Sequence, residues 1–325
     1  MLANHRIAWI FPSLTGACAI LVTTAAGCAD AERPARTEDE ARARAPVPAC
    51  IMPLTARSRT AGTMRNLSND QYWQAVFPTY DAQNHTLPVD ALTCTGAKIF
   101  DDPVFAGGTT RGTPIAVQDE DVEFGSGGDR VRIAWLRTHR WQDGSEAGPL
   151  ALVRAKQEYA EVYAVGAYRR SAGQLVLQAE RLGPELLVTA TADGCQGQAT
   201  SMPCEKNVDL FLPRFGKLER LVTLPAQKRA FATGSEPGVQ GQVQYEMTSS
   251  PQYTPDGIRL FEQVRALDEA GRVVHKTELE RMLVLHDGKL DQGSGSDLWG
   301  RVFPNASTGE PSPKGKGTQP DPAKK

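Results

Sequence analysis

The chain of 325 residues lacks the charge imbalance and most of the motifs that identify a functional class. Its 36 Lys and Arg side chains nearly balance 38 Asp and Glu, and the formal net charge of −2 gives no reason to expect a nucleic-acid partner. No Gly-x-Ser-x-Gly motif occurs, and no Ser-x-x-Lys motif leads an apparent helix. Five histidines without paired Cys and His spacing give no zinc signature. We therefore expect no catalytic residue, no metal, no cofactor and no enzymatic activity.

The beginning of the chain has the pattern of an export signal. Met1–Arg6 carries one cation, Ile7–Ala26 is almost continuously apolar, and small residues precede Cys28. A charged start, a short apolar core and a small-residue cleavage site are typical of an exported signal peptide. The approach to Cys28 resembles the lipobox of bacterial lipoproteins. That resemblance implies cleavage after residues 1–27 and acylation of Cys28.

The resemblance also implies where the protein is located. Several acyl chains hold a protein durably on a membrane, because each buried methylene contributes about 0.8 kcal/mol. Ala29 stands where lipoproteins kept at the inner membrane often carry Asp, so we expect an anchor in the outer membrane of a bacterial cell envelope. Ordinary secretion and a retained membrane anchor are the alternatives. Cys18 is a competing acceptor, but it would leave a shorter apolar core.

Four cysteines remain in the mature chain, and an even number in an exported protein predicts two disulfides. Sequence alone permits three pairings. Cys195 and Cys204 flank a short loop with turn-forming residues, so we expect them to pair, which leaves Cys50 to pair with Cys94. Loop-closure entropy predicts a stabilisation of about 3 kcal/mol from the short loop and about 4 kcal/mol from the long one.

The composition divides the mature chain into three parts. Residues 28–49 begin with the acylated cysteine and are rich in Ala, Arg, Glu and Pro, which predicts a disordered tether. Residues 50–305 carry the apolar patterns of a disulfide-stabilised β domain. Residues 306–325 predict a disordered, basic and Pro-rich tail, with contact to anionic envelope material as the alternative.

One short helix and many strands are expected in the folded part. Ser68 and Gln71 form a capping-box pattern, which predicts a helix of about two turns before Pro78. Short stretches of alternating apolar residues separated by turn signals follow, the first over 130–141. Thr277–Leu285 also fits a helical stripe and stays ambiguous. The fold class is all-β or mainly β, an antiparallel meander forming a barrel or a sandwich.

The densest polar and aromatic group in the sequence is the strongest candidate for a ligand site. If residues 130–141 form one strand, alternate side chains share a face that changes from apolar to charged. These side chains are Ile133, Trp135, Arg137, His139 and Trp141. Such a strand end could form the rim of a pocket, with Trp135 and Trp141 as apolar walls. The simpler alternative is a strand that leaves the core and enters solvent.

Three functions agree with these features. The first is a non-enzymatic envelope protein that binds or scaffolds another protein, glycan or lipid of the envelope. The second is a β-barrel carrier of a lipid or another small amphipathic ligand, with Trp135 and Trp141 near its mouth. The third is a hydrolase of envelope polymers, in which His139 and Asp143 would be the residues to test.

Overall fold

The computed structural model describes residues 47–54, 67–110, 122–124, 131–156, 158–233, 241–291 and 298–299. All of them belong to one unit, Glu38–Lys325. The leader with Cys28, most of the tether and the tail over 306–325 lie outside the described residues. Within the described ranges, no helix has both the length and the apolar character needed to cross a bilayer.

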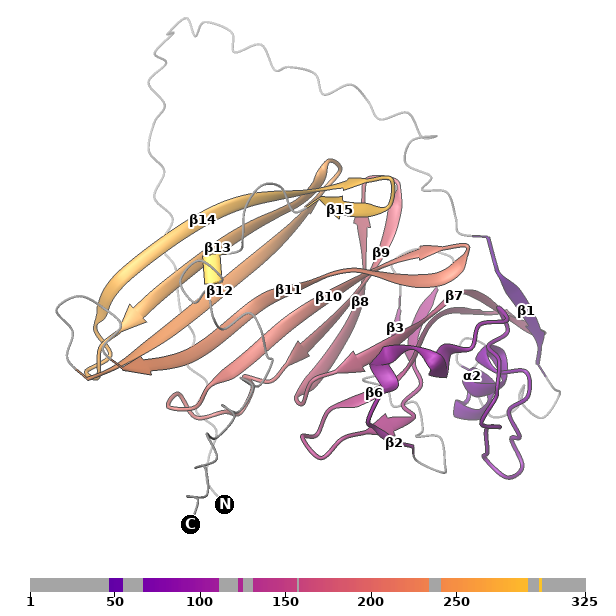
Figure 1. Cartoon of the computed structure of the whole chain (residues 1–325). Coiled ribbons are helices and arrows are strands. Elements are labelled where there is room, and N and C mark those ends of the chain that lie inside the picture. Colours follow the sequence, from indigo (N-terminus) through magenta and orange to yellow (C-terminus); the bar gives the residue numbers. More distant parts are fainter. Residues whose placement is uncertain are drawn as a thin grey trace, which may run out of the picture. The chain divides into compact units, whose positions relative to one another are not determined.

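The described residues form fifteen strands, the α-helix α2, two 3-10 helices and two further helical residues, Leu298 and Trp299 (Figure 1). The helices are α2 (Asn69–Val76), η2 (Ile99–Asp101) and η3 (Pro103–Phe105). The first seven strands are β1 (Cys50–Pro53), β2 (Thr109–Thr110), β3 (Val122–Phe124), β4 (Arg132–Trp135), β5 (His139–Arg140), β6 (Glu146–Ala155) and β7 (Tyr159–Arg170). The others are β8 (Gln174–Leu182), β9 (Glu185–Asp193), β10 (Cys204–Arg214), β11 (Gly216–Thr233), β12 (Gln242–Thr254), β13 (Gly257–Leu267), β14 (Val273–His286) and β15 (Lys289–Asp291).

All fifteen strands belong to one large, mostly antiparallel sheet. From β8 to β15, each strand pairs antiparallel with the next, so this half of the chain is a continuous meander. The sheet is open, because its main strand order ends at β3 and at β15. The expectation of a mainly β, antiparallel fold with one short helix is confirmed. The ambiguous Thr277–Leu285 lies in strand β14.

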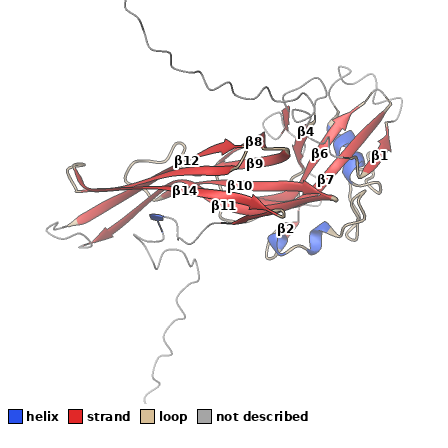
Figure 2. Ribbon diagram, turned by 90° about the horizontal axis from the view of Figure 1, so that it is seen from above, coloured by secondary structure: helices blue, strands red, loops and turns tan. Residues whose placement is uncertain are grey.

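The helix α2 forms as its sequence predicts. The Ser68 hydroxyl accepts a hydrogen bond from the Gln71 backbone N–H, and the Gln71 side chain accepts one from the Ser68 N–H. This capping box satisfies two N–H groups that have no partner inside the helix. The helix lies against β1 and β7 (Figure 2). Its Trp73 is fully buried and stacks between Phe77 and Tyr80, with ring centroids 5.9 and 5.7 Å away.

Four apolar clusters make up the core. One joins α2 to one face of β4, β6 and β7. The opposite face of these strands packs against β8, β9 and β10, so two layers of the sheet lie face to face as in a sandwich. A third cluster links β8–β11 to the adjoining ends of β12, β13 and β14. The fourth lies under Leu298 and Trp299, which cover β12 and β13.

An extra residue separates the two halves of the predicted strand over 130–141. Trp135 pairs with Leu150 and His139 pairs with Ala147. His139 is four positions after Trp135, whereas Ala147 is only three positions before Leu150, so this strand has one more residue than β6 over the same length. The extra residue lies between β4 and β5 and reverses the alternation of the side chains. The expectation of a single strand with one shared face is therefore wrong.

Gly148 of β6 lies opposite this irregularity. A Cβ atom at Gly148 would overlap the carbonyl oxygen of Leu136, while the Leu136 N–H donates to the Pro149 carbonyl at 2.8 Å. The close approach of two backbones requires glycine here.

We predict that Gly148→Ala lowers the free energy of unfolding by about 2 kcal/mol or more, because the new methyl group must push the two backbones apart. Urea unfolding measures this change. Gly197→Ala is the control, because nothing lies near a Cβ there and only its positive φ of 75° opposes the substitution. A smaller loss at Gly148 than at Gly197 would contradict the close approach.

Candidate functional site

The structure does not bring the four predicted ligand-binding residues together. Trp135 lies fully buried in the cluster between the two layers of the sheet. His139 is buried and Trp141 half-buried, and both rings belong to the opposite side of the strand, near Phe100 and Phe105. The extra residue between β4 and β5 produces this separation.

Arg137 belongs to a buried charge network beside Trp135. Its guanidinium lies 5.8 Å from the Trp135 ring centroid and 3.4 Å from Glu146 Oε2. Arg170 donates to the same carboxylate oxygen at 2.6 Å and lies 5.2 Å from the same ring centroid. Two guanidinium groups therefore share one carboxylate and one indole. This arrangement stabilises the buried charges and fixes the end of the two-layer core.

The residues around His139 do not form a hydrolase triad. The His139 Nδ1 lies 2.8 Å from the Thr138 hydroxyl, and its ring packs against Phe105 with centroids 4.8 Å apart. Asp143 instead accepts a hydrogen bond of 2.6 Å from the Ser145 hydroxyl. The described residues also contain no group of His, Cys, Asp and Glu side chains able to hold a metal ion.

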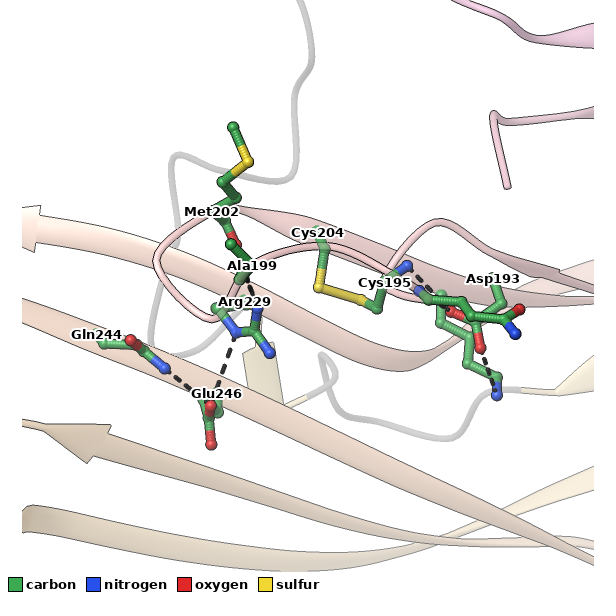
Figure 3. The surroundings of a disulfide bond; sticks show 10 residues. Asp193, Cys195, Ala199, Met202, Cys204, Arg229, Gln244 and Glu246 are labelled. Carbon is green, nitrogen blue, oxygen red and sulfur yellow. Dashed lines mark hydrogen bonds and ion pairs between the residues drawn. A yellow bond between two sulfur atoms is a disulfide. The ribbon is translucent and has the colours of Figure 1, made fainter. Parts of the chain in front are cut away.

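A groove lined mostly by polar residues lies near the same end of the two-layer region as Glu146 and Arg170, because only residues 171–173 separate Arg170 of β7 from Gln174 of β8. Its volume is about 400 Å³. It lies beside the Cys195–Cys204 disulfide, whose surroundings Figure 3 shows, and residues of β8, β9, β10 and β11 line it. The lining residues are Gln174, Val176, Thr191, Asp193, Cys195, Gln196, Lys206 and Gln227.

The register of four strands creates the floor of the groove. Gln174 of β8 pairs with Asp193 of β9, Asp193 with Lys206 of β10, and Lys206 with Gln227 of β11. Residues directly opposite each other in paired strands share a face of the sheet, so these four side chains form one row. Val176 and Thr191 form the next cross-strand pair and complete the wall.

Asp193 holds this part of the site in shape. The Lys206 ammonium lies 3.0 Å from one of its oxygens, while the backbone N–H groups of Cys195 and Gln196 donate to the other at 3.0 Å each. Burial raises the pKa of Asp193, but the hydrogen bonds from Lys206 and the loop N–H groups outweigh it and hold the pKa below its usual value. The carboxylate thus stays ionised and binds the start of the disulfide loop.

Arg229 of β11 holds the other end of the loop. Its guanidinium donates to the carbonyl oxygens of Ala199 and Met202, at 3.0 and 3.4 Å (Figure 3). Glu246 lies 3.7 Å from the Arg229 Nε and also accepts a hydrogen bond from Gln244. With the Cys195–Cys204 disulfide, these contacts fix the loop at several points. The groove is therefore bordered by a loop that is already positioned.

The sequence did not predict this groove. The structure contains the two expected disulfides, Cys50–Cys94 and Cys195–Cys204, and the second of them borders the groove. The only signal in the sequence was therefore the pair Cys195 and Cys204. The four residues of the row are 19, 13 and 21 positions apart, and they meet only through the strand register.

The pKa of His139 gives a prediction about acid stability. Burial lowers this pKa from its ordinary value of 6.5, so the folded protein favours neutral imidazole. The unfolded chain binds the proton more readily, and the free energy of unfolding falls as the pH drops below about 6.5. We predict that His139→Phe reduces the loss of stability between about pH 7.5 and pH 5.5.

Urea unfolding at the two pH values measures this difference. Phe105→Leu is the control, because it weakens the packing around His139 and keeps the imidazole. The control should lower stability at both pH values and retain the wild-type pH dependence. An unchanged pH dependence in His139→Phe would show that His139 does not contribute.

Comparisons with known proteins give no further guide to the site. No family model, curated protein or solved structure matches the chain. We therefore infer a function from the groove, the disulfides and the leader.

Proposed function

We propose that this chain is a lipid-anchored protein of the bacterial cell envelope, held in the outer membrane through Cys28, with a non-enzymatic role. Its β domain binds or scaffolds another envelope component at the groove beside Cys195–Cys204. The two disulfides suggest an extracytoplasmic protein, because such bonds persist in oxidising compartments. The leader over residues 1–27, followed directly by Cys28, supports the anchor.

The main support for a binding role is that the protein itself already holds the walls of the groove in place. A site whose walls are already fixed loses less conformational entropy when it binds. Here the disulfide, Asp193 and Arg229 each hold the bordering loop. Several polar side chains converge on a volume within the usual range for small-ligand sites.

The alternatives have no comparable observation in their favour. A carrier needs an apolar cavity, whereas the clusters inside the described sheet are filled by side chains such as Leu177, Leu210 and Phe211, each with 0 % exposure. A hydrolase needs a nucleophile or a pair of acidic groups in a cleft. Among the residues that line the groove, Asp193 is the only carboxylate, and it is paired with Lys206.

The anchor can be tested by changing the acceptor cysteine. We predict that the protein expressed in a bacterium with its own leader fractionates with membranes and carries acyl chains on Cys28, as shown by mass spectrometry. Cys28→Ala should move the protein out of the membrane fraction, while Cys18→Ala should behave like wild type. An unmodified wild-type protein, or membrane retention of Cys28→Ala, would contradict the anchor.

The groove can be tested in the intact envelope by placing a photo-crosslinking residue at Gln196. This exposed side chain lines the groove, and its backbone N–H rather than its amide contacts Asp193. Gln252, an exposed residue of β12 that does not line the groove, is the matched control position. We predict an adduct of defined mass from position 196 and none from position 252. The same adducts at both positions, or no adduct at 196, would contradict binding at the groove.

A further inference from the structure

We infer that the groove beside Cys195–Cys204 binds a neutral glycan, through hydrogen bonds from its row of polar side chains to sugar hydroxyl groups. This inference rests on the proposed binding function and specifies its ligand. Charge, hydrogen-bonding capacity, span and the scarcity of large apolar side chains each support it.

The charges in the groove compensate each other. Among the lining side chains, Asp193 is the only anion and Lys206 the only cation, and they form an ion pair of 3.0 Å. A ligand with a net charge would meet no excess of the opposite sign. It would also need to break the ion pair to gain one. A neutral ligand leaves the ion pair intact.

The remaining polar groups suit hydroxyl groups. Gln174, Gln196, Gln227 and Thr191 line the groove. Each glutamine amide offers two donors and a carbonyl acceptor, and the threonine hydroxyl both donates and accepts. A sugar hydroxyl group has the same double character, so one amide can bond two neighbouring hydroxyls of a ring. A carboxylate or a phosphate only accepts hydrogen bonds, so it would use the donors of these side chains and not their acceptors.

The length of the row indicates an oligosaccharide rather than a single sugar. Gln174 and Gln227 lie at the ends of a row that crosses four neighbouring strands. Three inter-strand steps of about 4.8 Å place their backbones about 14 Å apart. A chain of two or three sugar rings spans such a distance.

The apolar surface is too small for a lipid chain. Val176 is the only large apolar side chain among the lining residues, and it is 37 % exposed. No aromatic ring lines the groove, so no stacking platform strengthens the contact. We therefore expect weak binding, with a Kd of about 1 mM, which corresponds to about −4 kcal/mol.

The experiment is a titration of the lipidated mature protein in micelles of a sugar-free zwitterionic detergent. The probes are maltotriose, cellotriose and triacetylchitotriose as neutral trisaccharides, with deacetylated chitotriose as the cationic match of the last. Calorimetry and backbone amide NMR shifts report binding. We expect at least one neutral trisaccharide to bind, to shift amides of residues 191–206, and to keep its Kd between about 0.02 and 0.5 M salt.

Two groove variants test the assigned side chains. Gln174→Ala and Gln227→Ala should each raise the Kd of the bound trisaccharide at least threefold, because each removes hydrogen bonds at one end of the row. Gln252→Ala should leave the Kd unchanged. Thermal unfolding confirms that each variant is folded. Tighter binding of the cationic probe, a Kd that depends strongly on salt, or an equal rise in Kd in all three variants would overturn the inference.

The failure of this inference can be distinguished from failure of the proposed function. If no neutral trisaccharide binds while the crosslinker at Gln196 still captures a component in the envelope, the groove has a ligand of another class and the glycan inference is wrong. If neither the titration nor the crosslinker detects binding, both are wrong.

Discussion

The backbone pairing of β11 is the constraint on which the rest of this structure depends. Residues 217–229 pair with β10, residues 227–233 pair with β12, and Gly216 and Lys217 pair parallel with β7. Backbone N–H and C=O groups in a core must find partners, so a strand shared in this way determines where its neighbours lie. The two-layer region and the long strands β12–β14 are parts of one sheet because β11 belongs to both (Figure 1).

The groove lies where β11 changes partners. Gln227 pairs with Lys206 of β10 on one side and with Thr248 of β12 on the other. Next to it, Asn207 pairs with Pro225, so Ala226 is an extra residue that bulges from the ladder. Bulges are frequent beside functional sites, because they redirect side chains. The same strand supplies Arg229, which fixes the disulfide loop.

The features that the sequence predicted correctly are those that depend on local patterns. The capping box at Ser68, the alternation in the strands and the short loop between Cys195 and Cys204 involve residues close in the chain, and the structure contains all three. The shared face from Trp135 to Trp141 was not observed, because one extra residue reversed the alternation. The groove could not be predicted, because its row depends on the pairing of β9 with β10 across the disulfide loop and on two register shifts between β10 and β11, which shift Gln227 into line with Gln174.

We propose that the groove beside Cys195–Cys204 is an occupied binding site in the envelope. Amide hydrogen exchange tests it most directly, by comparing the protein in isolated envelope vesicles with the purified protein in detergent. We predict slower exchange in vesicles over residues 191–206, and equal exchange in the two preparations over 242–254 of β12. Equal exchange over 191–206 in both preparations, with protection confined to other strands, would contradict it.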